Sequence, residues 1–174
     1  MNCLTKLKFP LLIVLKMFLI PNANSAETLP FDEKFNLVNE VGYSIKISGD
    51  SQERVLSIND IEKLPLHKAN FDTPWGLKGD FVGVKLDDLL NHVGITEFKR
   101  LYVLASNGYK ITIENNDIGI KNAILASRLN GKPFALDMKG PFFIVWPDQA
   151  EDLVAGSASG VKWAWAVVEI QKIR

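Results

Sequence analysis

The sequence predicts an α+β domain made of mixed, mostly antiparallel β-structure with short helices. Two observations lead to this fold class. Short runs of β-branched and apolar residues recur between turn signals, and the few helical patterns do not alternate regularly with them. Of the 174 residues, 47% are apolar and 23% charged, a composition typical of one globular domain.

The first 26 residues have the pattern of a secretory signal peptide, in which lysines precede an apolar run that ends on small residues. Lys16 interrupts this run and Pro21 ends it, so the uninterrupted stretch is shorter than the roughly 20 residues that a membrane-spanning helix needs. We therefore expect cleavage after Ser25 or Ala26, a periplasmic location, and a single domain over residues 27–174. A retained membrane anchor is the alternative.

Charge and cysteine content exclude several classes of function for the exported domain. Removal of the signal segment takes away three lysines and no acids, which leaves 17 basic and 20 acidic residues and a net charge of about −3. We expect no nucleic-acid partner, because binding to phosphates needs a basic surface. The one cysteine, Cys3, lies in the signal segment, so the domain has no thiol for a disulfide, for catalysis or for a metal.

In the first half of the chain, strands are expected within residues 35–58, on either side of a Ser-Gly-Asp-Ser break. A short helix is predicted over residues 57–64, capped by Ser57 or Asn59 and stopped by proline. The apolar residues of 84–93 recur at helical spacing before Gly94, which predicts a second helix packed on the core.

In the second half, an Asn-Gly turn flanked by alternating apolar residues predicts a β-hairpin over residues 100–113. Residues 116–131 begin with a capping residue and end on Asn-Gly, with apolar residues along one side, and so predict a short helix. Two apolar runs, at 142–149 and 161–173, are of strand length, and we expect the second to close a sheet.

Common catalytic and metal-binding signatures are missing from the sequence. It contains neither a nucleophile elbow nor a phosphate-binding glycine loop. The only histidines, His67 and His92, lack the spacing of a metal motif. We expect His92 to serve a helix end and leave a ligand role for His67 open.

The sequence does contain aromatic residues beside polar groups in tight turns, an arrangement that suits a flat heteroaromatic ligand. Such a ring could stack on Trp75, Tyr109 or Trp163, and the polar edge of the ring could pair with a carboxylate or amide. The candidates for that pairing are Asp72, Asn107 and Asp148, with Thr73 beside them in the Trp75 turn. The alternative is that such rings belong to the core, which we expect for Trp165 and for one of Phe142 and Phe143.

Several ordered motifs together resemble the molybdopterin-binding domain of the sulfite oxidase superfamily, over about residues 54–173. They are a Trp75-x5-Phe81-Val-Gly-Val-x-Leu segment, "NGYKITI", "ILASRLNGKPF", "GPFFIVWP" and "GVKWAW". The resemblance implies a sulfite-oxidase-like fold. It also implies that Lys162 and Trp163 match the family's Val-Lys-Trp cofactor contact, and that Trp75 matches the aromatic loop residue beside the metal.

This sequence departs from the family at two positions. The bacterial periplasmic branch, which includes the catalytic subunit of a sulfoxide reductase, has a metal-ligating cysteine where this chain has Phe71. The catalytic families also have an arginine shortly after Gly-Pro, where this chain has Phe142 and Phe143. The chain is therefore more similar to small, exported, cysteine-less members, some of which bind a free reduced pterin.

The resemblance implies a periplasmic protein that binds a reduced, metal-free pterin and signals to a membrane-bound enzyme of cyclic di-GMP turnover. One alternative is an oxidoreductase with molybdopterin held by a ligand other than cysteine, in which the cofactor performs the chemistry. Another is an adaptor with no ligand at all. Burial of both Trp75 and Trp163, with no cavity between them, would favour the adaptor.

Overall fold

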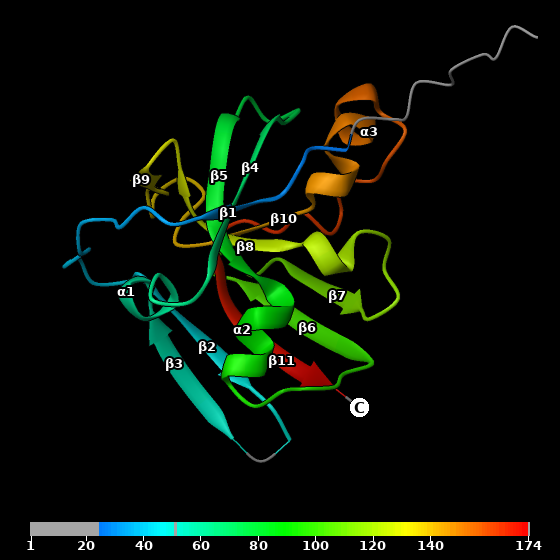
Figure 1. The fold of residues 1–174 in the computed structure, drawn as a ribbon. Helices are drawn as coiled ribbons and strands as arrows, with labels where there is room; N and C mark the ends of the chain where they lie inside the picture. The colour runs from blue at the N-terminus through cyan, green and yellow to red at the C-terminus, as the bar shows by residue number, and fades with distance from the viewer. Residues whose placement is uncertain (1–24, 51, 174) are drawn as a thin grey trace, which may run out of the picture.

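The computed structural model describes residues 25–50 and 52–173, and shows a mixed α+β fold with two sheets and a few short helices (Figure 1). All strand pairs are antiparallel except β2 with β11. The predicted fold class is therefore confirmed at this level. The predicted signal segment lies outside the described residues except for Ser25 and Ala26.

The first sheet has the strand order β1-β4-β5-β8-β10, with β9 paired to β8 off this path. A long hairpin, β4 and β5, forms its middle, and β1 from the N-terminal segment pairs with the outer edge of β4. The strands are β1 (Leu29–Phe31), β4 (Leu66–Asp72), β5 (Lys78–Lys85), β8 (Ile124–Leu129), β9 (Lys132–Pro133) and β10 (Phe143–Val145).

The second sheet has the order β3-β2-β11-β6-β7, in which two hairpins flank the C-terminal strand. Strand β11 was expected to close a sheet, but it lies in the centre of this one, between β2 and β6. The strands are β2 (Ser44–Ser48), β3 (Glu53–Ser57), β6 (Arg100–Ala105), β7 (Lys110–Glu114) and β11 (Val167–Ile173).

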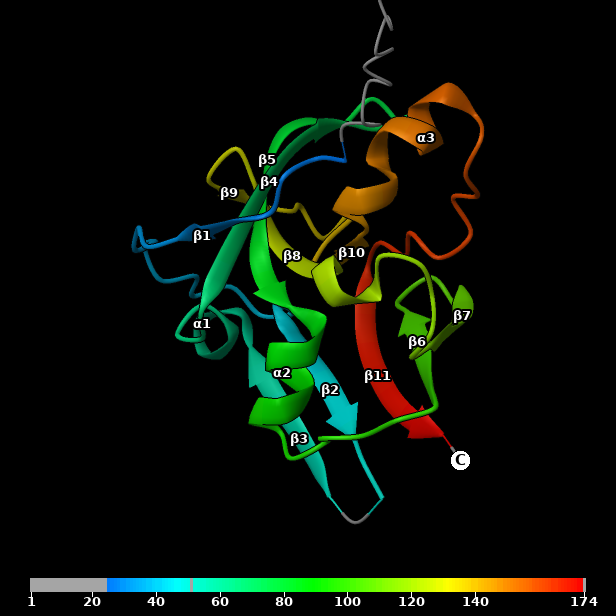
Figure 2. The same ribbon diagram turned by 45° about the vertical axis from the view of Figure 1, so that its right-hand side comes forward.

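Short helices connect these strands and cover parts of the sheets. Figure 2 shows α3 at the same end of the molecule as the turn that joins β4 and β5. The helices are α1 (Ile58–Ile61), α2 (Leu86–His92) and α3 (Ala150–Ala155), with 3-10 turns η1 (Ile120–Asn122) and η2 (Pro147–Gln149). Within the described residues, no helix has the length and apolar character needed to cross a membrane.

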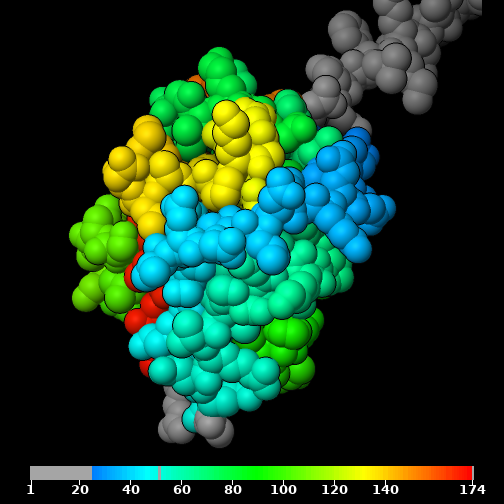
Figure 3. Space-filling view, turned by 90° about the vertical axis from the view of Figure 1, so that its left-hand side faces the viewer, coloured from blue at the N-terminus to red at the C-terminus, as the bar shows by residue number. Residues whose placement is uncertain are grey.

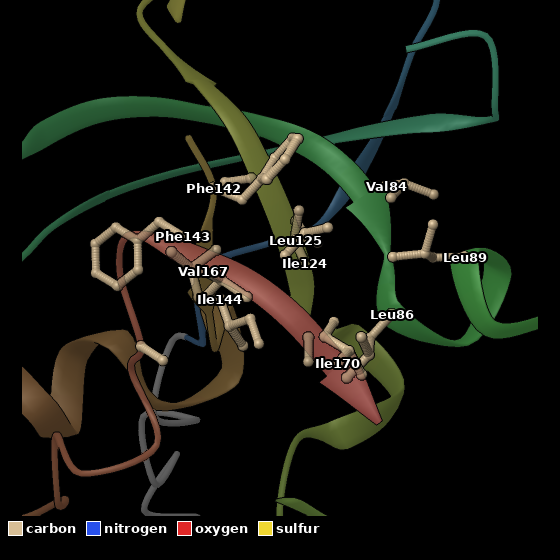
Figure 4. Packing of buried hydrophobic residues seen from close by; sticks show 14 of the residues in the cluster. Val84, Leu86, Leu89, Ile124, Leu125, Phe142, Phe143, Ile144, Val167 and Ile170 are labelled. Atoms are coloured by element: carbon tan, nitrogen blue, oxygen red, sulfur yellow. The ribbon is translucent and has the colours of Figure 1, made fainter. Parts of the chain in front are cut away.

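One hydrophobic core joins the two sheets. Side chains of β5, β8 and β10 meet those of β11 and α2 in a single buried cluster (Figure 4). Leu86 and Leu89, on the inner side of α2, are fully buried, as the helical spacing of residues 84–93 predicts.

Most predicted elements are present. The strands around the Ser-Gly-Asp-Ser break are β2 and β3, the two helices are α1 and α2, and the hairpin of residues 100–113 is β6 with β7. The run at 142–149 contains β10 and then η2, whereas in the run at 161–173 the strand begins only at Val167.

The helix predicted over residues 116–131 is wrong. The segment forms the turn η1 and then β8, which pairs with β5 on one side and β10 on the other. Five of the six residues of β8 are buried, because neighbouring layers cover both faces of the strand. A strand buried on both faces is apolar throughout, so its sequence can match helical spacing by coincidence.

The N-terminal segment runs across one face of the domain before entering β2 (Figure 3). The side chain of Asn59, in α1, fixes this segment through both backbone groups of Val38. It accepts a hydrogen bond from the Val38 N–H at 2.9 Å and donates one to the Val38 carbonyl at 2.8 Å. The residues before β2 are therefore held against α1 by specific bonds rather than only by apolar contact.

Helix α1 begins with a capping box, as its predicted cap, Ser57, suggested. The Ser57 hydroxyl accepts a hydrogen bond from the Asp60 N–H at 3.2 Å, and the Asp60 carboxylate accepts one from the Ser57 N–H at 3.1 Å. The Ser57 hydroxyl also donates to the Asp60 carboxylate at 2.6 Å. Bonds from Ser57, followed by Lys63, lower the pKa of Asp60 to about 2.

We expect Ser57→Ala to lower the free energy of unfolding by about 1 kcal/mol at pH 7, the usual cost of losing a capping hydroxyl. The lowered pKa of Asp60 stabilises the fold above the ordinary carboxyl pKa of 3.8, and this stabilisation is lost as the pH falls toward about 2. The difference between variant and wild type should therefore shrink over that range, modestly, because Asp60 is half exposed and screened by solvent. Urea unfolding at several pH values measures it, and a difference independent of pH would contradict the role of Asp60.

Candidate functional site

One packed cluster between the first sheet and the segment that precedes β11 contains four of the aromatic residues singled out from the sequence, Trp75, Phe143, Trp163 and Trp165, whereas Tyr109 and Phe142 are not part of it. Its centre is Phe143 of β10, whose ring centroid lies 6.0–6.3 Å from those of five neighbouring aromatic side chains. We call this the aromatic cluster; its members are Phe71, Trp75, Phe81, Phe134, Phe143, Trp163 and Trp165.

Trp75 and Trp163, both expected to stack on a ligand, pack on each other instead. Their ring centroids are 6.0 Å apart, with the planes inclined by 53°. A flat ring sandwiched between two indoles would need parallel planes about 7 Å apart, twice the contact distance of two carbon atoms. The arrangement therefore leaves no slot between these two side chains.

The Trp75 side chain is half-buried at the tip of the β4–β5 hairpin, where it lies against the loop that follows α3. A side chain added at Gly160 would meet the indole at 3.0 Å, so glycine there allows the loop to approach the ring. Trp75 also contacts Trp165 edge-on, with a centroid distance of 5.3 Å. The ring therefore connects the hairpin tip to this loop.

Trp163 is 1% exposed, and its indole nitrogen Nε1 has no hydrogen-bond partner among the residues that the structure describes. The other buried indole, Trp146, donates its Nε1–H to the Lys162 carbonyl at 2.9 Å. An unpaired buried donor is uncommon and costs free energy, since the group loses its contacts with water. This nitrogen is the one feature of the aromatic cluster that packing leaves unexplained.

Phe71, at the position where the resemblance places a metal-ligating thiolate, is part of the aromatic cluster. Its ring stacks on Phe81, with centroids 4.3 Å apart and planes inclined by 3°, and meets Trp163 edge-on at 5.7 Å. The side chain is 8% exposed. Its surroundings are those of a core residue, with apolar rings where a metal would need donor atoms.

Asp72 and Thr73 are occupied in forming the β4–β5 turn. The Asp72 carboxylate pairs with Lys78 across the hairpin at 2.6 Å, and both side chains are more than half exposed. The Thr73 hydroxyl donates to the Leu77 carbonyl at 3.1 Å and accepts from the Leu77 N–H at 3.2 Å. These bonds account for both polar residues without a ligand.

Asn107 and Tyr109 lie in the turn between β6 and β7. The Asn107 side-chain oxygen accepts a hydrogen bond from the Tyr109 N–H at 3.0 Å, a local turn bond. The Tyr109 hydroxyl donates to the Val161 carbonyl at 2.8 Å, and the side chain remains 43% exposed. Tyr109 thus fastens this turn to the loop before Trp163 and keeps much of its surface open to solvent.

Lys162 and Asp148 also have protein partners. The Lys162 ammonium forms an ion pair with Asp117, and that carboxylate is largely shielded from solvent. Asp148 accepts two hydrogen bonds, both at 3.1 Å, from the Asn122 side-chain amide, whose oxygen accepts from Lys85 at 3.3 Å. Asp117 and Asn122 were missed from the sequence, since nothing local distinguishes them from ordinary turn residues.

The predicted site residues therefore fall into two groups. Trp75 and Trp163 belong to the aromatic cluster, with Asp72 and Thr73 in the same hairpin turn. The second group lies where surface loops meet: Tyr109 bonds Val161, and Lys162 pairs with Asp117. Asn107 and Asp148 lie in neighbouring turns. We call the residues 106–109, 115–119 and 157–162 the loop surface.

The contact between Lys139 and Trp165 was also not predicted from the sequence. Its ammonium lies 3.8 Å from the centre of the Trp165 ring, and burial lowers its pKa. A cation over an indole is favourable, particularly where solvent is excluded. Trp165, expected in the core, is partly buried, and Phe142 and Phe143 are both fully buried although only one was expected to be.

The described residues do not suit the molybdenum cofactor. Among them, no group of three or more His, Cys, Asp or Glu side chains could hold a metal ion. Phe71, where the resemblance places the thiolate, is a phenyl ring stacked on Phe81, and the residues after Gly140-Pro141 are buried phenylalanines. No reaction step through such a cofactor can be assigned to these side chains.

The described part of the chain has three surface cavities, and neither Trp75 nor Trp163 lines any of them, although Phe71 of the aromatic cluster lines the smallest. One of about 850 Å³ lies beside α2 and the end of β11, and one of about 780 Å³ lies beneath the N-terminal segment, with His67 in its wall. A smaller one, of about 390 Å³, lies between β4 and α3 and includes Asp72. Burial lowers the pKa of His67, with a further contribution from Lys85, which favours the neutral ring.

No protein-family model matches the chain, and no curated protein is similar to it at a significant level.

Proposed function

We propose that this chain is an exported, non-enzymatic binding protein with a sulfite-oxidase-like fold, and that it acts by contacting another protein through the loop surface. The observation that carries the proposal is the aromatic cluster. The rings expected to hold a cofactor contact one another, and Phe71 stands in the position of the metal ligand. Trp163 is buried and the half-buried Trp75 lies directly against it, which supports an adaptor over a cofactor-dependent enzyme.

The loop surface has the features of a protein-binding patch. Tyr109, Ile118 and Val161 expose 43%, 81% and 60% of their side chains, around the Lys162–Asp117 ion pair. The loops are held by the Tyr109–Val161 bond and by the bond from Gln149 to the Ile118 carbonyl. They therefore lose little conformational freedom on binding. Exposed aromatic and aliphatic side chains beside charged ones are typical of interfaces. The resemblance suggests a membrane-bound enzyme of cyclic di-GMP turnover as the partner.

Exchanging Val161 for glutamate tests this surface. We expect Val161→Glu to reduce recovery of the partner by about tenfold or more in affinity purification from native membranes, because a charge would replace an apolar contact at the interface. The matched control is Val41→Glu, since Val41 is 95% exposed and lies outside the loop surface. Mass spectrometry identifies the recovered proteins. Equal recovery with both variants would exclude the loop surface as the binding site.

A pterin sensor is the second candidate, and the unpaired Nε1–H of Trp163 is the observation that favours it. A pterin offers ring nitrogens and a carbonyl that could accept this bond, and its flat ring is similar in size to an indole. The Trp75 ring occupies the space over Trp163, so a pterin would have to displace it. In this reading, Trp75 is a plug at the hairpin tip and not a stacking platform.

The effect of Trp75→Ala on the affinity for a pterin therefore shows whether Trp75 blocks the site or stacks on the ligand. A plug predicts that the variant binds tetrahydrobiopterin more tightly than wild type, because no ring must be displaced first. A stacking platform predicts weaker binding, by about 1–3 kcal/mol per stacked ring. Isothermal titration measures both proteins after circular dichroism confirms that the variant is folded. If neither protein binds, the pterin candidate is lost.

The decisive experiment on function is to identify what the protein carries when purified from the periplasm of its native host. Mass spectrometry and fluorescence of the denatured protein detect a released pterin, and elemental analysis detects molybdenum. An empty protein supports the adaptor, a metal-free pterin supports the sensor, and molybdopterin with stoichiometric metal would restore the oxidoreductase.

A further inference from the structure

The described chain makes its first specific contact with the folded domain at Ala26. The Ala26 N–H donates a hydrogen bond to the Pro147 carbonyl at 3.2 Å, and its methyl group packs against the hydrophobic core. Ser25, one residue earlier, is exposed. Among the described residues, contact with the folded domain therefore begins at Ala26, directly after the Ser25–Ala26 peptide bond.

The surroundings of the Ala26 nitrogen are suited to a positive charge. Ala26 lines the cavity of about 390 Å³ between β4 and α3, and the acidic side chains of Asp72 and Glu151 line the same cavity. Asp72 is neutralised by Lys78, whereas Glu151 lies in the first turn of α3 and has no ion-pair partner within the described residues. An amide N–H gains little from a nearby carboxylate, but an ammonium gains charge-assisted hydrogen bonds.

We propose that the Ser25–Ala26 bond is the site of signal-peptide cleavage, and that the new α-ammonium group of Ala26 binds at the Pro147 carbonyl, beside Glu151. The inference rests on the export that the proposed function assumes. In the cleavage, a signal peptidase adds water across the peptide bond: the Ser25 carbonyl carbon gains the hydroxyl and leaves as a carboxylate. The Ala26 nitrogen gains the other hydrogen of the water and the proton that the new carboxylic acid releases, and becomes an ammonium with three donors.

The sequence around the bond agrees with this choice between the two expected cuts. Cleavage after Ser25 places serine immediately before the bond and Ala23 two residues further back, and both are small. Cleavage after Ala26 would place the larger Asn24 at the earlier position. It would also remove the residue that bonds Pro147 and packs on the core.

Two variants of the full-length chain, expressed in a Gram-negative host, distinguish the two bonds. Signal peptidases require a small residue immediately before the cut. Ser25→Phe is therefore expected to block cleavage and leave the precursor, whereas Ala26→Phe changes only the residue after the cut and should still be processed. Cleavage after Ala26 predicts the reverse result. Intact mass and N-terminal sequencing of the periplasmic fraction give the position directly.

An N-terminal Ala26 in the wild-type protein supports the inference, and an N-terminal Glu27 or any other processed end overturns it while leaving export intact. A protein that keeps Met1 overturns the cleavage site, and it overturns the exported function as well only if it is recovered in the cytoplasm and not at the membrane. As a second measurement, mature protein beginning at Ala26 should melt about 2–4 °C above protein beginning at Glu27, from the loss of one hydrogen bond. Equal melting temperatures would contradict the proposed contact.

Discussion

Replacing Glu62 with alanine is expected to lower the free energy of unfolding by about 3–5 kcal/mol, the usual result of leaving one member of a buried ion pair without its partner. Glu62 ends α1, and its carboxylate binds Arg128 of β8 through two bonds, from Nε at 2.7 Å and from Nη2 at 2.9 Å. The two side chains are only 8% and 5% exposed. The alanine variant would leave the Arg128 guanidinium buried without a counter-charge.

The loss should extend beyond the pair, because Arg128 also holds the N-terminal segment. Its Nη2 donates to the Asn36 carbonyl at 3.0 Å, and its guanidinium carbon lies 4.2 Å from the centre of the Phe35 ring. The Ser127 hydroxyl donates to the Glu62 carboxylate at 2.9 Å, and in the variant its remaining acceptor would be the Val82 carbonyl, at 3.5 Å. The pair therefore joins α1, β8 and the segment before β2.

Urea unfolding of Glu62→Ala measures this effect, and Lys78→Ala is a matched control. The Lys78–Asp72 pair has a similar distance, 2.6 Å, but its side chains are 68% and 52% exposed. Surface pairs contribute at most about 1 kcal/mol. A loss in Glu62→Ala no larger than that in Lys78→Ala would show that the carboxylate contributes no more than a surface charge.

The elements predicted correctly are those whose residues interact locally. The Asn107-Gly108 turn, the Ser57 cap of α1 and the amphipathic residues of α2 each define their own element over a few residues. Strand β8 was misassigned because its conformation depends on distant partners, with β5 pairing on one side and β10 on the other. The spacing of apolar residues does not indicate which strands pair with this one, and the apolar pattern of residues 120–129 fits a helix equally well.

The candidate site was less predictable than the fold, for a related reason. An aromatic side chain beside a tight turn has the same sequence context whether its ring meets a ligand or another ring. Trp75 and Trp163 were predicted individually, but their mutual contact depends on how the β4–β5 hairpin packs on the segment before β11. Polar candidates such as Thr73 and Asn107 are common turn residues, and the structure accounts for both by turn bonds.

Gly83, which belongs to the Phe81-Val-Gly-Val motif that suggested a cofactor-binding domain, has a packing role between two strands. A Cβ atom at this position would lie 2.1 Å from the Leu125 carbonyl oxygen and 2.6 Å from the Ala126 Cα. The β5–β8 register shifts between Val82 and Gly83, so the strands approach each other closely at this irregularity. Glycine is therefore required here for space.

Gly83→Ala is accordingly expected to lower the free energy of unfolding by about 3 kcal/mol or more, at the upper end of overpacking effects. The atoms that a methyl group would strike belong to the backbone of β8, which cannot rotate away as a side chain can. Relief requires the two central strands of the first sheet to separate, together with the Phe81 and Val84 side chains that they place in the core. Thermal and urea unfolding of the purified variant measure the loss.

Gly76→Ala, in the turn of the same hairpin, separates this steric effect from the conformational effect of losing a glycine. An added Cβ at Gly76 meets nothing within 4 Å, but the residue has a φ of +78°, so alanine there should cost only about 1 kcal/mol of backbone strain. The expected order is a much larger loss at Gly83 than at Gly76. Equal losses would mean that β5 and β8 can separate at low cost. The motif glycine would then need another explanation, such as the close approach of a ligand to the backbone.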